Sequence, residues 1–189
     1  HKNVYDEFLK NFIALTKKYV VGDAMDEDTT LGPMVNAMAS YFVREQVTQA
    51  RKLGAVLNIS EEDFPISGDD ANYFAPQILT QVNHKMAIMK RESFAPVVGI
   101  MQVEDDEQAI ELVNDSVYGL TASIWSEDIE ACIHLGEKIN VGTVFMNRCD
   151  YLDPALAWVG VKDSGRGCSL SLLAYQVLTR PKSFHLKNP

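Results

Sequence analysis

The feature that most constrains the fold is a succession of short apolar runs with an amphipathic segment between the last two. Residues 97–103 are almost entirely apolar, and residues 121–126 and 141–147 form two further runs. A strand that helices cover on both faces needs apolar side chains on both sides, so such runs are typical of a parallel sheet. A helical pattern at residues 127–138 completes a βαβ arrangement. We therefore predict an α/β fold: three layers, with a mainly parallel sheet and helices on both faces.

The chain opens with a helical pattern rather than a strand. Apolar side chains recur every three or four residues between residues 2 and 20, and a second helix is predicted at residues 36–53. In an α/β domain a helix normally follows a strand, so this beginning indicates an incomplete domain with sequence upstream of His1. Two further strands are predicted at residues 55–59 and 73–82.

Charge and cysteine usage exclude several classes of partner and site. The formal net charge of −9 repels phosphate backbones, so we expect no nucleic-acid partner. No apolar stretch is long enough to span a bilayer and the N-terminus does not look like a signal peptide, so we expect no membrane partner and a cytoplasmic or organelle-matrix location. Neither a disulfide framework nor a metal site is expected, because the three cysteines lack the required spacing. The acidic run at residues 104–107 is interpreted as the start of a helix.

Two side chains just ahead of the first apolar run form the best candidate for a binding site. Glu92 and Phe94 are two residues apart, so in an extended backbone they project to the same side. A carboxylate can accept hydrogen bonds from the vicinal hydroxyls of a ribose, and an aromatic ring can pack on a flat heterocycle. The alternative is an ordinary loop in which Glu92 is a surface residue and Phe94 a core residue. Residues 148–158 form a second candidate, because long irregular loops in compact domains tend to be functional.

Several short motifs together resemble the C-terminal part of the aldehyde dehydrogenase family, over essentially the whole chain. They are Val4-Tyr5-Asp6-Glu7-Phe8, Val21-Gly22-Asp23, Leu31-Gly32-Pro33, Glu92-Ser93-Phe94-Ala95-Pro96-Val97, Asn114-Asp115-Ser116-Val117-Tyr118-Gly119-Leu120, Gly142-Thr143-Val144-Phe145-Met146-Asn147 and Lys162-Asp163-Ser164-Gly165. The resemblance implies part of a catalytic domain over residues 1–175. It also implies an oligomerisation strand or tail over residues 176–189, and hence a homo-oligomer.

The same resemblance implies roles for individual residues. In this family the glutamate of the E-x-F-x-P motif holds the nicotinamide ribose and the phenylalanine sits against the nicotinamide, which assigns these roles to Glu92 and Phe94. The residues implied at the substrate entrance are Asn147, Arg148, Cys149 and Trp158. For Trp158 the alternative is that its ring anchors the loop in the core.

The family reaction uses a cysteine thiolate to attack an aldehyde, passes a hydride to NAD or NADP, and hydrolyses the thioester with water that a glutamate activates. The resemblance places both catalytic residues upstream of His1, and none of Cys132, Cys149 and Cys168 has the context of the nucleophile. We therefore expect a fragment, inactive alone, of an NAD(P)-dependent dehydrogenase that oxidises a small-molecule aldehyde to a carboxylic acid. The alternatives are a non-catalytic scaffold or assembly module with the same fold, and an unrelated α/β binding domain, which the motif order disfavours.

Overall fold

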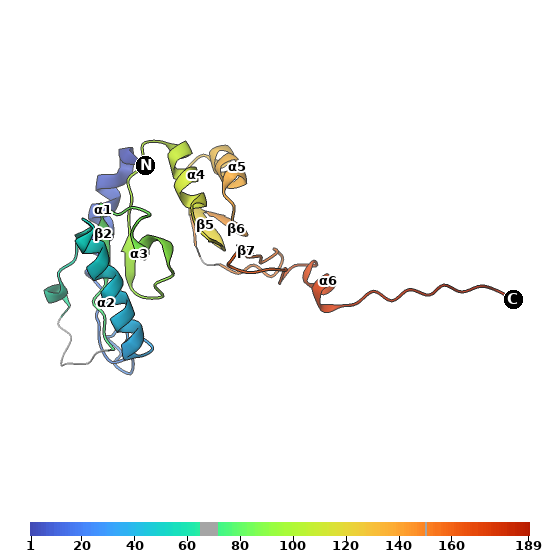
Figure 1. Cartoon of the computed structure of the whole chain (residues 1–189), viewed down its shortest axis with the longest axis horizontal. Helices are drawn as coiled ribbons and strands as arrows, with labels where there is room; N and C mark the ends of the chain where they lie inside the picture. The colour runs from blue at the N-terminus through green and yellow to red at the C-terminus, as the bar shows by residue number, and fades with distance from the viewer. Residues whose placement is uncertain (65–71, 150) are drawn as a thin grey trace. The chain divides into compact units, whose positions relative to one another are not determined.

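The computed structural model describes residues 1–64, 72–149 and 151–189 (Figure 1). The chain divides into two compact units, His1–Asp105 and Asp106–Pro189. The first unit contains a three-stranded sheet whose central strand pairs antiparallel with one neighbour and parallel with the other. Its strands, in spatial order, are β1 (Val56–Leu57), β2 (Gln77–Thr80) and β3 (Val97–Gly99).

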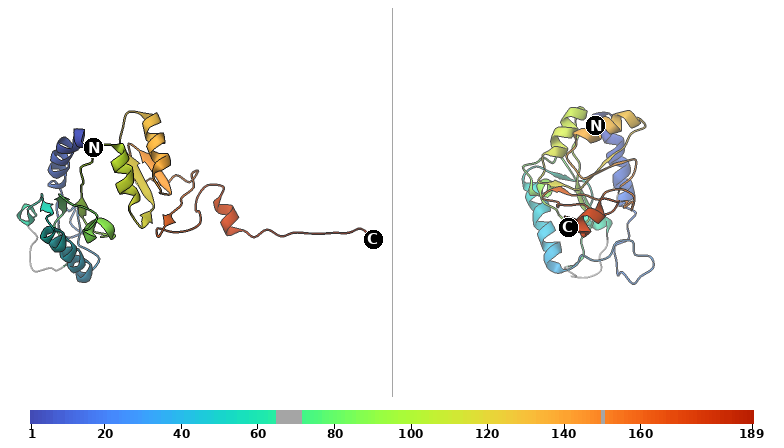
Figure 2. Two further views of the ribbon diagram at one scale, coloured as in Figure 1. Left: turned by 45° about the horizontal axis from the view of Figure 1, so that its top comes forward. Right: turned by 90° about the vertical axis from the view of Figure 1, so that its right-hand side faces the viewer.

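Helices cover both faces of this sheet (Figure 2). They are α1 (Lys2–Thr16), α2 (Ala37–Lys52) and the short α3 (Ala87–Lys90). Successive residues of a strand point to opposite faces, and Ile78 and Leu79 of β2 are 1% and 0% exposed. Leu79 packs in a cluster with side chains of α2 and α3, whereas Ile78 packs in a second cluster bordered by side chains of α1. The first unit therefore has the predicted three layers.

Helix α2 begins and ends where the sequence provides a signal. The side chain of Asn36 accepts a 2.8 Å hydrogen bond from a backbone N–H in the first turn of α2, which is a typical N-cap. Gly54 follows that helix with a φ of 103°, a conformation that favours glycine. Helix α1 ends at Thr16, earlier than the sequence predicts. The chain instead turns so that the backbone N–H of Val20 donates to Thr30 Oγ1 at 2.8 Å.

The second unit contains the predicted βαβ arrangement. Strands β5 (Thr121–Ile124) and β6 (Thr143–Met146) pair in parallel, and α5 (Ile129–Lys138) connects them. The acidic residues Asp106 and Glu107 occupy the first turn of a further helix, as predicted. The remaining elements of this unit are α4 (Asp106–Asn114), β4 (Tyr118–Gly119), β7 (Val161–Lys162) and α6 (Ala174–Leu178).

One segment of the second unit differs from the prediction. The sequence predicts a turn at residues 118–120, but Tyr118 and Gly119 form β4 and pair antiparallel with β7. A Cβ at Gly119 would lie 2.5 Å from a methyl carbon of Val161 and 2.6 Å from the carbonyl oxygen of Asn140. The glycine therefore permits a close approach of backbones and does not mark a turn.

The observed strands are shorter than the apolar runs that predict them, because only part of each run has a pairing partner. Residues 73–82 contribute only β2, and residues 97–103 contribute only β3. Within the described ranges, no helix is both long enough and apolar enough to cross a membrane.

The C-terminal tail follows from the end of a short helix. Residues 174–178 form α6, and residues 179–189 belong to no helix or strand. The oligomerisation strand expected within residues 176–189 therefore stays a prediction.

The Asp63 carboxylate connects the 3-10 helix η1 (Glu61–Asp63) to the residue that follows α1. Lys17 Nζ lies 2.9 Å from Asp63 Oδ2, and the same side chain accepts a hydrogen bond from the backbone N–H of Ser60 at 3.3 Å. The hydrogen bond from Lys17, with the bond from Ser60 and the charge of Lys17, lowers the pKa of Asp63 below its ordinary value of 3.8. A lowered pKa in the folded state means that ionised Asp63 stabilises the fold above pH 3.8.

We predict that Asp63→Asn lowers the urea midpoint of unfolding at neutral pH. The difference from the parent protein should disappear as the pH falls below 3.8, because the parent carboxylate itself then becomes protonated. Urea titrations from neutral to strongly acid pH measure this. Asp28→Asn, in an exposed turn, is the control and should show no such pH dependence. A difference for Asp63→Asn that is constant over the whole pH range would contradict the prediction.

Candidate functional site

The loop that joins α3 to β3 contains the first pair of predicted site residues. Its middle residue, Ser93, donates a 2.7 Å hydrogen bond through Oγ to Oε1 of Gln46, a side chain of α2 that is 4% exposed. This bond fixes the loop to a helix that lies 47 residues earlier in the chain. The residues on either side of Ser93 are both exposed: Glu92 and Phe94, the latter to 90%.

The exposure of Phe94 contradicts the alternative in which it is a core residue. A large aromatic side chain is usually mostly buried, so a ring that is 90% exposed is unusual in a loop that is otherwise fixed. The backbone of Phe94 has a φ of 38°, which is sparsely populated by bulky residues. Such strained residues concentrate at ligand sites, and this observation favours a binding role.

The φ of Phe94 also shows that the extended backbone expected for residues 92–94 is wrong. Glu92 and Phe94 were assigned to the same side of an extended segment, but the segment is not extended at Phe94. Both side chains are exposed because the Ser93 side chain between them takes the inward hydrogen bond. The carboxylate of Glu92 makes no hydrogen bond or ion pair with the described part of the chain, so its oxygens can accept hydrogen bonds from a ligand.

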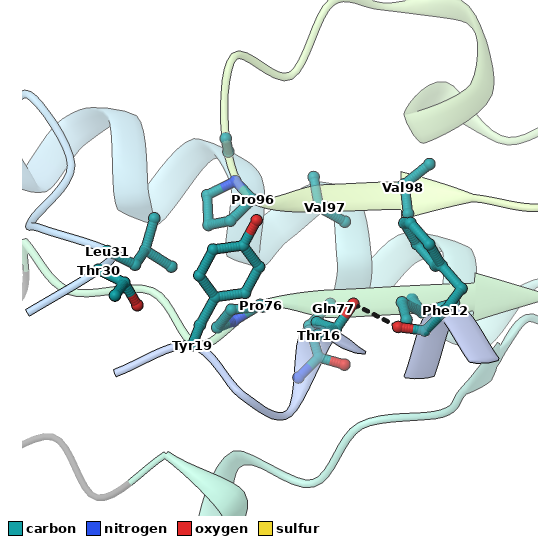
Figure 3. A pocket seen from close by; sticks show the side chains of 12 residues that line it. Phe12, Thr16, Tyr19, Thr30, Leu31, Pro76, Gln77, Pro96, Val97 and Val98 are labelled. Atoms are coloured by element: carbon teal, nitrogen blue, oxygen red, sulfur yellow. Dashed lines mark hydrogen bonds between the residues drawn. The ribbon is translucent and has the colours of Figure 1, made fainter. Parts of the chain in front are cut away.

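A groove of about 440 Å³ adjoins the C-terminal end of this loop. Figure 3 shows the ring of Tyr19 lying between Pro76 and Pro96, with Phe12 further along the two strands. The lining is mostly apolar, which suits a flat or apolar group. No local sequence pattern reveals this groove, because its walls come from α1, the loop after it and two strands.

In the second unit, Asn147 follows β6 and fastens the ends of two parallel strands together. Its backbone N–H donates to the carbonyl oxygen of Ile124 at 3.0 Å. Its side chain accepts from the backbone N–H of Ser126 at 2.9 Å and donates to the carbonyl oxygen of the same residue at 2.7 Å. With a φ of 54°, Asn147 turns the chain sharply out of the sheet, so the loop that follows has a fixed starting point.

The next predicted entrance residues lie at the start of that loop. The guanidinium carbon of Arg148 lies 3.9 Å from the centre of the Tyr151 ring, within cation–π distance. The backbone carbonyl of Arg148 accepts a hydrogen bond from Ser123 Oγ of β5. Cys149 is exposed and has a free thiol. The first part of the loop therefore presents a cation and a thiol to solvent.

Trp158 lies at the far end of the same loop, and its backbone is fixed. It forms an isolated antiparallel bridge with Ser169, with hydrogen bonds of 2.7 and 3.0 Å. The side chain is half-buried, so the substrate-entrance role and the core-anchor role both remain predictions. One residue later, the carbonyl oxygen of Val159 lies where a Cβ of Gly142 would be, at 1.5 Å, so the loop returns directly over the start of β6.

Glycine and asparagine residues hold this unit together, and sequence analysis assigned them no structural role. Asn114, at the end of α4, donates to the carbonyl oxygen of Lys138 at 2.8 Å and accepts from the backbone N–H of Asn140 at 2.7 Å. Its own carbonyl accepts from Lys162 Nζ at 3.1 Å. The short sequence motifs contain these asparagine and glycine residues. A motif of Asn and Gly at a helix end commonly marks a capping position or a close approach of backbones, so the motifs were the sequence signal for this structural role.

The predicted site residues therefore fall into two groups. Glu92 and Phe94 lie in the first unit, and Asn147, Arg148, Cys149 and Trp158 lie in the second. No group of three or more His, Cys, Asp or Glu side chains among the described residues is arranged to hold a metal ion.

Comparison with known proteins identifies close relatives. The sequence profile described as the aldehyde dehydrogenase family matches residues 1–184. An aldehyde dehydrogenase of Paenarthrobacter nicotinovorans is 35% identical over 171 residues, which are 90% of this chain and 37% of that protein. The chain thus spans well under half the length of this curated relative.

Solved structures give the same result. A succinic semialdehyde dehydrogenase from Streptococcus pyogenes, in complex with NADP+, matches 98% of this chain and 40% of its own with a TM-score of 0.88 and 32% identity. A betaine aldehyde dehydrogenase from Staphylococcus aureus, in complex with NAD+, matches 94% of this chain and 35% of its own with a TM-score of 0.82 and 28% identity. The α/β fold of the chain is the fold of these enzymes.

The hydrogen bond between Ser93 and Gln46 should contribute to the stability of the chain. Ser93→Ala leaves the buried Oε1 of Gln46 without its hydrogen-bond partner, which should destabilise the chain by about 1 to 3 kcal/mol. Urea unfolding measures this free energy. The double variant Gln46→Leu with Ser93→Ala removes the buried amide as well and should be less destabilised than Ser93→Ala alone. A double variant that is destabilised as much as Ser93→Ala alone, or more, would contradict the anchoring role.

Proposed function

The chain belongs to the aldehyde dehydrogenase family, and on this premise we propose that it is the part of an NAD(P)-dependent aldehyde dehydrogenase that holds the nicotinamide end of the cofactor and shapes the substrate entrance. The complete protein then oxidises an aldehyde to a carboxylic acid. The observation that supports this most directly is the exposed, strained Phe94 beside the unpaired carboxylate of Glu92, on a loop whose middle residue is fixed to α2.

The geometry of this loop fits a nicotinamide nucleoside. The Glu92 carboxylate can accept hydrogen bonds from both ribose hydroxyls, and the exposed ring of Phe94 offers a flat apolar face to the heterocycle. The bond between Ser93 and Gln46 holds the loop in place before the ligand arrives, so little order is lost on binding. When bound, the nicotinamide supplies the acceptor for the hydride that leaves the substrate carbon.

The substrate entrance in this proposal is formed by the loop that starts at Asn147. The clamp between Asn147 and Ser126 sets the direction of the loop, and the Arg148 guanidinium on the Tyr151 ring places a positive charge there. Trp158 closes the loop at its other end. Aldehydes that approach this loop would meet a cation and an aromatic ring before they reach the reacting groups.

The nucleophile and the base are supplied, in this proposal, by polypeptide other than these 189 residues. A reactive thiolate needs a neighbouring base or cation. Cys132 is buried in α5, and neither Cys149 nor Cys168 hydrogen-bonds to a histidine within the described ranges. These features support assigning no catalytic role to the three thiols.

Assembly of the complete protein is proposed to use the C-terminal tail. Large apolar side chains from Leu172 to the C-terminus are strongly exposed, and exposed apolar segments of this kind usually pack against another chain. A second copy would bury them, which supports a homo-oligomer. A location in the cytoplasm or an organelle matrix is part of the same proposal. The residues concerned are Leu172, Leu173, Tyr175, Val177, Leu178, Phe184 and Leu186.

We predict that the 189-residue chain alone shows no aldehyde oxidation. The reason is that, among the described residues, none of the three free thiols hydrogen-bonds to a histidine that could activate it. Incubating the purified chain with NAD or NADP and a panel of aldehydes, and following nicotinamide absorbance, measures this. Turnover that is lost on Cys149→Ser or Cys168→Ser would sink the assignment of the nucleophile to other polypeptide.

In the complete protein, Glu92→Gln should weaken cofactor binding by about 1 to 3 kcal/mol, because hydrogen bonds to a charged acceptor are replaced by bonds to a neutral one. This corresponds to an increase of about 5- to 150-fold in the dissociation constant of NAD or NADP. Fluorescence titration of the cofactor measures it. Glu62→Gln, an exposed residue of η1, is the matched control and should leave the constant unchanged. Equal constants for Glu92→Gln and the parent would count against the ribose role.

A further inference from the structure

A second candidate site lies in the first unit, between α2 and the segment formed by β1 and η1. Two hollows of about 550 and 270 Å³ adjoin each other there. They share four lining residues from four different elements or element ends, and these four residues include both charge signs and one amide. The shared residues are Arg51, Leu57, Glu61 and Gln77.

Gln77, at the start of β2, is a buried residue whose side-chain amide lacks hydrogen-bond partners. It is 3% exposed, yet neither Nε2 nor Oε1 has a hydrogen-bond partner among the described residues. By strand alternation it shares a face with Leu79, which packs towards α2. A buried amide without partners destabilises a fold, and natural structures keep one where water, an ion or a ligand supplies the missing bonds.

Cationic and polar side chains of α2 border the same hollows. Arg44, Thr48 and Arg51 are four and three residues apart, so they lie on one face of the helix. Arg44 is held in place: Nη2 donates to the carbonyl oxygen of Tyr73 at 2.7 Å, and its guanidinium carbon lies 5.3 Å from the centre of the Phe74 ring.

The two arginines differ in how far their charge is compensated. The nearest carboxylate to Arg44 is Glu61 at 3.7 Å, which is itself exposed. Arg51 has no ion pair in the described part of the chain. The lining of the two hollows therefore includes two cationic side chains, one carboxylate and one buried amide without hydrogen-bond partners.

We propose that this hollow binds a small hydroxy- or amino-carboxylate. The carboxylate of the ligand lies against Arg51 and Arg44, where guanidinium groups match its geometry. Nε2 of Gln77 donates to a ligand oxygen, and Oε1 of Gln77 accepts from the ligand hydroxyl or ammonium group. Glu61 provides a second acceptor for that donor group. A ligand of this class supplies both a donor and an acceptor to the Gln77 amide and a negative charge to Arg51.

The test uses the 189-residue chain labelled with nitrogen-15, with L-malate, L-aspartate and succinate as probes at constant ionic strength. Malate and aspartate carry a hydroxyl and an ammonium donor, and succinate carries neither. The Gln77 side-chain amide signals, assigned by their loss in Gln77→Leu, should shift and saturate with malate or aspartate. Succinate should bind at least about tenfold more weakly, because a site that hydrogen-bonds a donor rejects the analogue that lacks it.

Two variants separate a built site from general attraction of anions. Arg51→Gln should weaken binding at least about tenfold, whereas Lys52→Gln removes a charge from the same helical turn outside the hollow and should leave binding unchanged.

Gln77→Leu should raise the urea midpoint of the ligand-free chain, because it removes an unsatisfied buried amide. The proposal is overturned by the absence of a saturable Gln77 shift, by equal effects of Arg51→Gln and Lys52→Gln, or by a lower urea midpoint for Gln77→Leu.

Discussion

The burial of β2 on both faces is the constraint on which the first unit depends. All four residues of this strand are buried, and the two apolar residues at its centre face different helix layers. Because the strand cannot shift by one residue without exchanging Ile78 and Leu79 between layers, its register fixes the positions of β3 and of the loop that precedes β3. The placement of Glu92 and Phe94 follows from that register and from the single bond between Ser93 and Gln46.

In the second unit the equivalent constraint is close contact between backbones. Gly119 and Gly142 lie where a Cβ would overlap atoms of the returning segment around residues 159–161, and Asn114 bridges the ends of α4 and α5. These contacts bring the end of the loop after Asn147 back to the beginning of β6. The loop is thus fixed at both ends by residues outside it, so its interior side chains can vary without loss of the fold, which is the usual relation between a rigid scaffold and a selective loop.

The sequence predicted what depends on local pattern and failed where distant contacts decide. The helices near residues 2–16 and 37–52 and the βαβ unit follow from periodicity, and the α/β class follows from them. The strand at Tyr118 was missed because its partner lies more than forty residues later, and glycine in a short polar segment resembles a turn. Phe94 was assigned an extended backbone because local alternation cannot include a hydrogen bond to Gln46, 47 residues away. Glu92 and Phe94 are predicted as site residues from their position ahead of an apolar run and from a family motif, whereas Gln77 belongs to no motif.

Two features of the first unit reduce its stability in isolation. Phe94 leaves a large apolar ring in water on a strained backbone, and Gln77 buries an amide without partners. Neither feature helps the chain to fold, because the ring makes few contacts and the amide has lost its hydrogen bonds to water. In the two proposals above, a flat heterocycle supplies the contacts that the ring lacks, and a polar ligand supplies the hydrogen bonds that the amide lacks.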